Sequence, residues 1–160
     1  MQKRKIVLAS ISPRRKRLLE QIGLEFEIKE SAYQEDMNAL ADPLELVKFL
    51  ALKKAENVAK HYDDAIIIGA DSLVIFNGRP LGKPKDEADA RRILRGLSGQ
   101  ENKAITGYAI IDIKNKIVVN KHSQATVKFR NFSHEEIDEY IATGEPLVMA
   151  GAYGLMDKGA

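Results

Sequence analysis

The chain has 160 residues, with 25 lysines and arginines against 23 acidic residues, a formal net charge of +2 and no cysteine. This length fits one domain, expected to span residues 1–160, and the lack of cysteine excludes disulfides, thiolate metal sites and cysteine nucleophiles. No apolar run approaches the roughly 20 residues of a membrane helix, and the interspersed charges give little general attraction to nucleic acid. We therefore expect a cytoplasmic protein with neither a membrane nor a specific nucleic acid as partner.

The first part of the chain predicts a strand, a helix and a second strand. The short apolar run at residues 6–9 is typical of a buried strand. Ser12 and Pro13 suit the N-cap and first position of a helix that Gly23 ends. The apolar stripe expected on this helix comprises Leu18, Leu19 and Ile22. Alternating apolar and charged residues at 25–29 then predict a second strand.

The middle of the chain predicts a long helix and a buried strand. Asp42-Pro43 opens a helix that runs to about Tyr62, and residues 65–69 form the strand. After Ala70-Asp71-Ser72 the chain continues extended over residues 73–76. Asn77-Gly78 is then a tight-turn signal.

The last part of the chain predicts two helices and two long strands. Asp86 caps a helix that ends at Ser98-Gly99, and residues 104–113 and 117–129 form two strands around a turn. Ser133 with Glu136 is a capping box for a helix that stops at Gly144. Beyond it we expect loop with at most a short strand. This order predicts one α/β domain whose mixed, partly antiparallel sheet is flanked by helices.

Four consecutive basic residues, at positions 14–17, open the first predicted helix. A cation at a helix N-terminus is unfavourable by on the order of 0.3–1 kcal/mol, unless an anion lies there. Backbone N–H groups and the guanidinium groups of Arg14 and Arg15 both bind phosphate oxygens. The cluster is therefore either a solvated basic face or an anion site, and the preceding Ser10-x-Ser12-Pro13 favours the anion site.

Lys54 and Asp71 are the next candidates. By its spacing Lys54 lies within the apolar face of the long helix. Such a lysine is either paired or functional, or its stem runs along the helix edge to reach solvent; both interpretations remain. Asp71 follows a buried strand, where α/β sheets often carry catalytic acids, although aspartate also forms turns.

Weaker signals lie in the loops. Residues 78–84 approach a P-loop, but three residues instead of four separate the glycines and Pro84 follows the lysine, so we reject that motif. Lys83 remains either a phosphate ligand or a solvated lysine. Glu35 lies in a polar loop and has the oxygen chemistry that a hard metal ion prefers.

Taken together, these segments resemble the Maf family of nucleoside triphosphate pyrophosphatases. The matching segments occur in family order across nearly the whole chain. They are Leu8-Ala9-Ser10-x-Ser12-Pro13-Arg14-Arg15, Lys54-Ala55, Ile68-Gly69-Ala70-Asp71-Ser72, Gly82-Lys83-Pro84, Leu97-Ser98-Gly99, Thr143-Gly144-Glu145-Pro146 and Ala150-Gly151-Ala152-Tyr153-Gly154.

The resemblance implies an α/β fold with a central cleft, like that of the inosine triphosphate pyrophosphatases, and a possible homodimer. It implies hydrolysis of a nucleoside triphosphate (dTTP, UTP or a modified nucleotide) to the monophosphate and pyrophosphate. A divalent metal cation, Mg²⁺ or Mn²⁺, would be held by Glu35 and Asp71, with Asp71 also the base for the attacking water. The catalytic residues that it implies are Asp71, Lys83 and Lys54. The substrate-binding residues that it implies are Ser10, Arg14, Arg15 and Ser72.

Some positions depart from the family pattern. Asn102 stands where a histidine is common, Met149 replaces a lysine, and Met156-Asp157 replaces a Gln-Gly whose glutamine helps to read the base, so the preferred base stays open. Met149, Met156 and the short C-terminus motivate an alternative, a nucleotide-binding regulatory protein with little or no turnover, which the retained Asp71, Lys54 and Lys83 argue against. Relatives usually continue past the position of Ala160 through a further strand, so either the sheet is one strand shorter or the chain is truncated.

Overall fold

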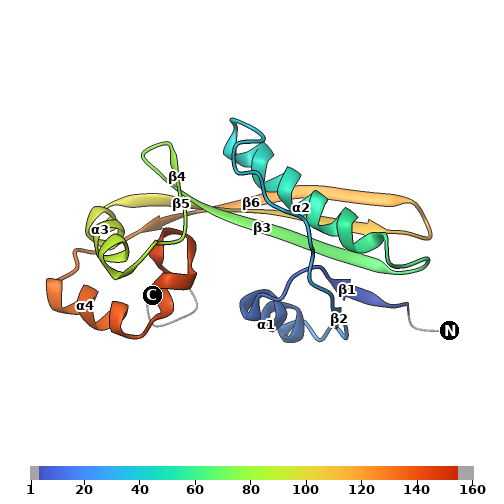
Figure 1. Ribbon diagram of the computed structural model, residues 1–160, viewed down its shortest axis with the longest axis horizontal. Helices are drawn as coiled ribbons and strands as arrows, with labels where there is room; N and C mark the ends of the chain where they lie inside the picture. Colours follow the sequence, from blue (N-terminus) through green and yellow to red (C-terminus); the bar gives the residue numbers. More distant parts are fainter. Residues whose placement is uncertain (1–3, 155–160) are drawn as a thin grey trace. The chain divides into compact units, whose positions relative to one another are not determined.

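The computed structural model describes residues 4–154, which form a mixed sheet with four α-helices (Figure 1). The elements in chain order are β1 (Ile6–Leu8), α1 (Pro13–Gln21), β2 (Glu27–Ile28), α2 (Pro43–Ala59), β3 (Ile66–Phe76), β4 (Arg79–Leu81), α3 (Glu87–Leu97), β5 (Glu101–Asp112), β6 (Ile117–Lys128), α4 (His134–Ala142) and the short 3-10 helices η1 (Glu145–Val148) and η2 (Ala150–Ala152). The sheet order is β2-β1-β3-β5-β6, with β4 paired to β3. Because β1 is parallel to β2 and β3 whereas β4 is antiparallel to β3, the predicted mixed α/β sheet is confirmed.

The chain divides into two compact units, residues 1–71 with 106–123 and residues 72–105 with 124–160. In the first unit, the core joins α2 to the strands through small and branched residues such as Val7, Ala55 and Ile67. In the second unit, α3 and α4 pack together around residues such as Leu97 and Ile141. Each unit thus has a core of its own, and the expectation of a single domain over 1–160 stays a prediction.

Three helices begin where the sequence predicts, because side chains cap their first turns. The side chain of Asp42 accepts a hydrogen bond from the backbone amide two residues on, and that of Asp86 from the amide three residues on. Ser133 and Glu136 form the expected capping box, each accepting from the other's backbone N–H. These bonds satisfy amides that a helix leaves without intrahelical partners, so the predicted starts are confirmed.

Helix α2 lies close against the strands of the first unit because two strand glycines have no side chain (Figure 1). A Cβ atom added at Gly69 would lie 2.9 Å from the Cβ of Ala55 and would also clash with the α2 backbone. One added at Gly107 would lie 2.6 Å from the backbone nitrogen of Lys48. Since alternate residues of a strand share a face, the buried Asp71 lies on the same face of β3 as Gly69, toward α2.

Strand β3 runs without a break through Asp71, so the prediction of a strand that ends before this residue is wrong. The first half of β3 pairs with β1 and the second half with β4, and pairing on both sides of Asp71 keeps the chain extended there. Asn77 and Gly78 both have positive φ, of 50° and 74°. They make the two-residue turn of the β3–β4 hairpin, which confirms the turn signal.

One further expectation, for α1, is wrong, whereas the expectation for the segment after Gly144 is not contradicted. The apolar stripe of α1 is not buried: Leu18 is 47% and Ile22 70% exposed, because the rest of the described chain does not cover that side of this short basic helix. Between Gly144 and Gly154 the chain forms η1 and η2 and no strand, which agrees with the expected loop; positive φ at Gly144 and Gly151 turns the backbone away from an extended path. Met156-Asp157 lies outside the described residues.

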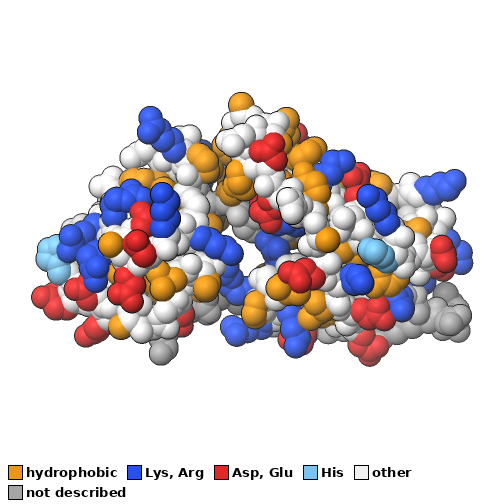
Figure 2. Space-filling model, in the orientation of Figure 1, with side chains coloured by type: hydrophobic (Ala, Val, Ile, Leu, Met, Phe, Trp, Pro, Cys, Tyr) orange, Lys and Arg blue, Asp and Glu red, His pale blue; other side chains and the backbone are white. Residues whose placement is uncertain are grey.

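Across residues 4–154, no helix combines the length and the apolar character needed to cross a membrane. Figure 2 shows lysine and arginine side chains interspersed with acidic ones over the visible face. This distribution agrees with the mixed charge pattern of the sequence.

Candidate active site

The segment between β1 and α1 brings Ser10 and Arg15 together. The backbone amide of Ala9 donates to the carbonyl of Ile68 (2.8 Å), which fixes the end of β1 beside β3. The buried Ser10 Oγ then accepts hydrogen bonds from Arg15 Nη1 (3.0 Å) and from the backbone N–H of Ser12 (3.2 Å). The Ser12 side chain makes no capping bond to α1. The first-turn amides of α1 therefore lack this cap, beside an arginine that is already held in place.

Lys54 lies at the centre of a cluster of charged side chains. It is only 9% exposed, and its Nζ donates a hydrogen bond to Asp71 Oδ1 within an ion pair. The same Nζ lies 2.7 Å from Glu35 Oε1, whose side chain is 43% exposed and reaches the cluster from the loop between β2 and α2. Lys54 is thus a paired, buried lysine, which resolves the two interpretations left open by its spacing.

The charges of the cluster extend to Arg15. Burial raises the pKa of Asp71, and Glu35 raises it further, whereas the positive charges of Lys54 and Arg15 oppose the rise. Burial also lowers the pKa of Arg15, against the attraction of Asp71 and Glu35. Because Asp71 interacts with Lys54, Glu35 and Arg15, the structure joins these four residues into one electrostatic site within the first unit.

The other predicted site residues lie around or outside this cluster. Arg14 is partly buried in α1 and is close enough to Arg15 to lower its pKa. Ser72 follows Asp71 in β3 and is exposed, with its side chain on the opposite face of the strand. Lys83 is exposed just after β4. Ser72 and Lys83 belong to the second unit, and their roles stay predictions.

The carboxylates of Glu35 and Asp71 fit a hard divalent cation, because both already converge on one cationic group, the ammonium of Lys54. Within residues 4–154, no three histidine or acidic side chains are grouped to hold a metal ion. Mg²⁺ is commonly bound by one or two carboxylates, with water and substrate phosphates as further ligands. The two carboxylates of Glu35 and Asp71 match that pattern.

The sequence did not predict the hydrogen bonds of two asparagines, Asn57 and Asn102. Asn57 on α2 accepts hydrogen bonds from the loop that carries Glu35. Asn102 accepts a hydrogen bond of 2.6 Å from the hydroxyl of Tyr153, and burial raises the pKa of this tyrosine to about 12. Asn102 was noted only as a departure from the family pattern, and an asparagine inside a helix or strand has no special spacing, so neither contact could be predicted.

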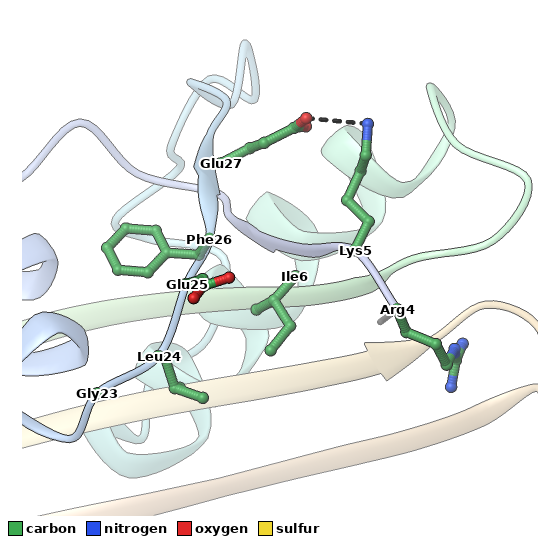
Figure 3. Close-up of a pocket in the computed structure, with 8 residues that line it drawn as sticks. All are labelled: Arg4, Lys5, Ile6, Gly23, Leu24, Glu25, Phe26 and Glu27. Atoms are coloured by element: carbon green, nitrogen blue, oxygen red, sulfur yellow. Dashed lines mark ion pairs between the residues drawn. The ribbon is translucent and has the colours of Figure 1, made fainter. Parts of the chain in front are cut away.

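A separate cavity of about 430 Å³ lies near the starts of β1 and β2 (Figure 3). Its lining comprises Arg4, Lys5, Ile6, Gly23, Leu24, Glu25, Phe26 and Glu27. Lys5 points toward Glu27 at 2.9 Å, and Arg4 is bound by Asp64 and Asp112. Its two basic residues are therefore already paired, and it contains none of the predicted site residues.

The chain is similar to several known proteins. A "dTTP/UTP pyrophosphatase" of Dictyoglomus turgidum is 45% identical over 159 residues, which cover 99% of this chain and 82% of that protein. A protein of the same name from a strain of Bacillus cereus is 47% identical over 157 residues, covering 98% and 81%. Among solved structures, protein VC0702 from Vibrio cholerae aligns with a TM-score of 0.44 and 16% identity, over 79% of this chain and 61% of that chain. The family of Maf-like proteins matches residues 5–160, and the chain therefore belongs to the Maf family.

Proposed function

We propose that this protein hydrolyses nucleoside triphosphates, with dTTP and UTP as substrates, to the monophosphate and pyrophosphate. The observation that carries the proposal is the buried Lys54, held between Asp71 and Glu35. The same two carboxylates also attract Arg15. The relatives named dTTP/UTP pyrophosphatase support the choice of substrate, since the chain covers more than four-fifths of their length.

Binding of the triphosphate calls for several positive charges, because the ligand carries about four negative ones. Arg15 presents a planar fork that can hold two phosphate oxygens, and its bond to Ser10 orients that fork. The first-turn amides of α1 and the side chain of Arg14 add further donors. Lys83 and Ser72 are proposed as additional substrate ligands on the strength of their family motifs.

Glu35 and Asp71 are the residues that would hold Mg²⁺ or Mn²⁺. The metal, when bound, would polarise phosphate oxygens and help to neutralise the departing pyrophosphate. Lys54 contributes its positive charge to the binding of the triphosphate. The raised pKa of Asp71 makes this carboxylate a better proton acceptor than an ordinary aspartate.

The reaction follows from these roles. Asp71 orients a water molecule and takes its proton while the water oxygen attacks the α-phosphorus. The bond from the α-phosphorus to the bridging oxygen breaks, and pyrophosphate leaves with the electron pair. Arg15 and Lys54 stabilise the charge that develops on the leaving group.

The test is a panel of common and modified nucleoside triphosphates incubated with Mg²⁺ or Mn²⁺, with both products measured. We expect monophosphate and pyrophosphate in equal amounts, with the highest kcat/KM for dTTP and UTP. Nucleotide binding without turnover would instead support the regulatory alternative. Release of inorganic phosphate and a diphosphate would contradict the proposal.

A further inference from the structure

The side chain of Asn57 on α2 binds residues near the start of the loop between β2 and α2. Its Oδ1 accepts a hydrogen bond of 2.9 Å from the backbone N–H of Ala32 and one of 3.3 Å from the hydroxyl of Ser31. The Ser31 oxygen in turn accepts from the backbone N–H of Tyr33, at 3.2 Å. Three consecutive loop residues are thus tied, directly or through one hydroxyl, to a single acceptor atom.

The same loop reaches the active site two residues later. Glu35 contacts Lys54, which lies three positions before Asn57 on α2. Residues three apart are neighbours on a helix surface, so the two attachments of the loop are neighbours on one rigid element. Glu35 is partly exposed and comes from a segment without regular structure. Its position therefore depends on what holds the loop.

We propose that Asn57 is a positioning residue, which places Glu35 for metal binding by anchoring the loop at residues 31–33. The inference rests on the role of Glu35 in the proposed function. A ligand is effective when its supporting contacts hold it near its bound geometry before the ion arrives. Asn57 supplies such a contact without touching the ion or the substrate.

The anchor requires a hydrogen-bond acceptor at position 57. In both hydrogen bonds the Asn57 side chain acts through its oxygen, as an acceptor. Aspartate presents the same oxygen at the same reach, whereas alanine presents none. Loss of the anchor leaves the Ala32 amide and the Ser31 hydroxyl in a loop that water can reach, where water can satisfy both groups. The loss therefore displaces Glu35 more than it destabilises the fold.

The experiment is a Mn²⁺ titration of the full-length protein without nucleotide, with free Mn²⁺ followed by electron paramagnetic resonance. Asn57→Ala is expected to raise the Kd for Mn²⁺ about tenfold, the lower end of the range for supporting residues of metal sites. Asn57→Asp should stay within about threefold of the wild type, because it keeps the acceptor. Glu56→Ala, at the next position of α2, removes a 2.8 Å ion pair with Lys53 and should leave the Kd unchanged.

Two further variants test the anchor and the metal ligand independently of Asn57→Ala. Ser31→Ala removes one of the two donors to Asn57 and should raise the Kd for Mn²⁺ less than Asn57→Ala does. Because Ser31 lies in a loop, this variant also tests the anchor if Asn57→Ala folds poorly. Glu35→Gln should weaken Mn²⁺ binding at least as much as Asn57→Ala. An unchanged Kd in both Ser31→Ala and Asn57→Ala overturns the inference. An equal loss of Mn²⁺ affinity in Asn57→Asp and Asn57→Ala also overturns it. So does full Mn²⁺ affinity in Glu35→Gln. Mn²⁺ binding is measured without turnover. Absence of triphosphate hydrolysis would therefore refute the proposed function but not the role of Asn57.

Discussion

At the scale of single residues, the site depends on a lysine whose charge is buried between two carboxylates. Such a buried ion pair adds little net stability over apolar side chains of similar volume, but removal of one partner leaves an uncompensated charge that is costly. Lys54 and Asp71 therefore depend on each other in the folded state. Glu35 is more exposed than Asp71, so its ion pair with Lys54 is broken more easily.

Asp71→Asn tests the proton acceptor. Asparagine keeps the shape and one hydrogen-bonding oxygen toward Lys54, but it cannot take a proton from water. We expect kcat for dTTP to fall at least about a hundredfold, with the protein still folded by circular dichroism. Asp63→Asn, an exposed acid in the same unit, is the matched control and should retain full activity. Full activity in Asp71→Asn would remove Asp71 as the base.

Lys54→Met tests the mutual dependence of the buried charges. Without Lys54, the free energy of unfolding should fall by on the order of 3 kcal/mol at neutral pH, and Lys54→Met/Asp71→Asn should regain much of that loss. Burial already raises the pKa of Asp71 above its unfolded value. Folding thus favours the protonated form of Asp71. The loss of stability in Lys54→Met should therefore shrink at acidic pH and grow as the pH rises through the folded pKa of Asp71. Urea unfolding across pH measures this; a deficit independent of pH would contradict it.

At the scale of elements, the position of Lys54 over Asp71 follows from the close approach of α2 to β3. Gly69 permits that approach, because any side chain there would meet the α2 backbone. The sequence marked Gly69 only as part of a motif. Its packing role depends on which helix lies against which strand, and no local pattern encodes that.

Gly69→Ala should therefore separate α2 from β3. We expect a loss of about 3 kcal/mol or more in the free energy of unfolding, at the upper end of overpacking effects, and a lower affinity for triphosphate. In Gly96→Ala, the added Cβ in α3 would lie 3.9 Å from its nearest neighbour, the ring of Phe76. That variant should keep or gain stability, and denaturant unfolding of both variants is the measurement. Equal stability of the two proteins would refute the packing role of Gly69.

Helix starts could be predicted from the sequence, because a cap is a local interaction among neighbouring residues, as at Asp42 and Ser133. The inward position of Lys54 followed from helical spacing, and its two partners did not, since both come from distant parts of the chain. The unbroken path of β3 through Asp71 is also set by distant strands, whose pairing overrides the weak strand propensity of aspartate. Leu18 and Ile22 of α1 show the converse, because an apolar pattern along a helix does not by itself bury its residues.

At the scale of the whole molecule, the groups that the structure brings together all belong to the first unit. All five predicted residues of the cluster lie in residues 1–71. Lys54 belongs to α2 and Asp71 to β3, whereas Arg15 belongs to α1. Ser10 follows β1, and Glu35 lies in the loop between β2 and α2. Lys83 and Ser72 belong to the second unit, which has its own core. The central claim is that the first-unit cluster directs water to the α-phosphorus.

Hydrolysis of dTTP in water enriched in heavy oxygen tests that claim most directly, with mass spectrometry of both products. Attack at the α-phosphorus predicts the label in the monophosphate and none in pyrophosphate, with the reaction lost in Asp71→Asn. Label in the pyrophosphate would place the attack at the β-phosphorus and contradict the account.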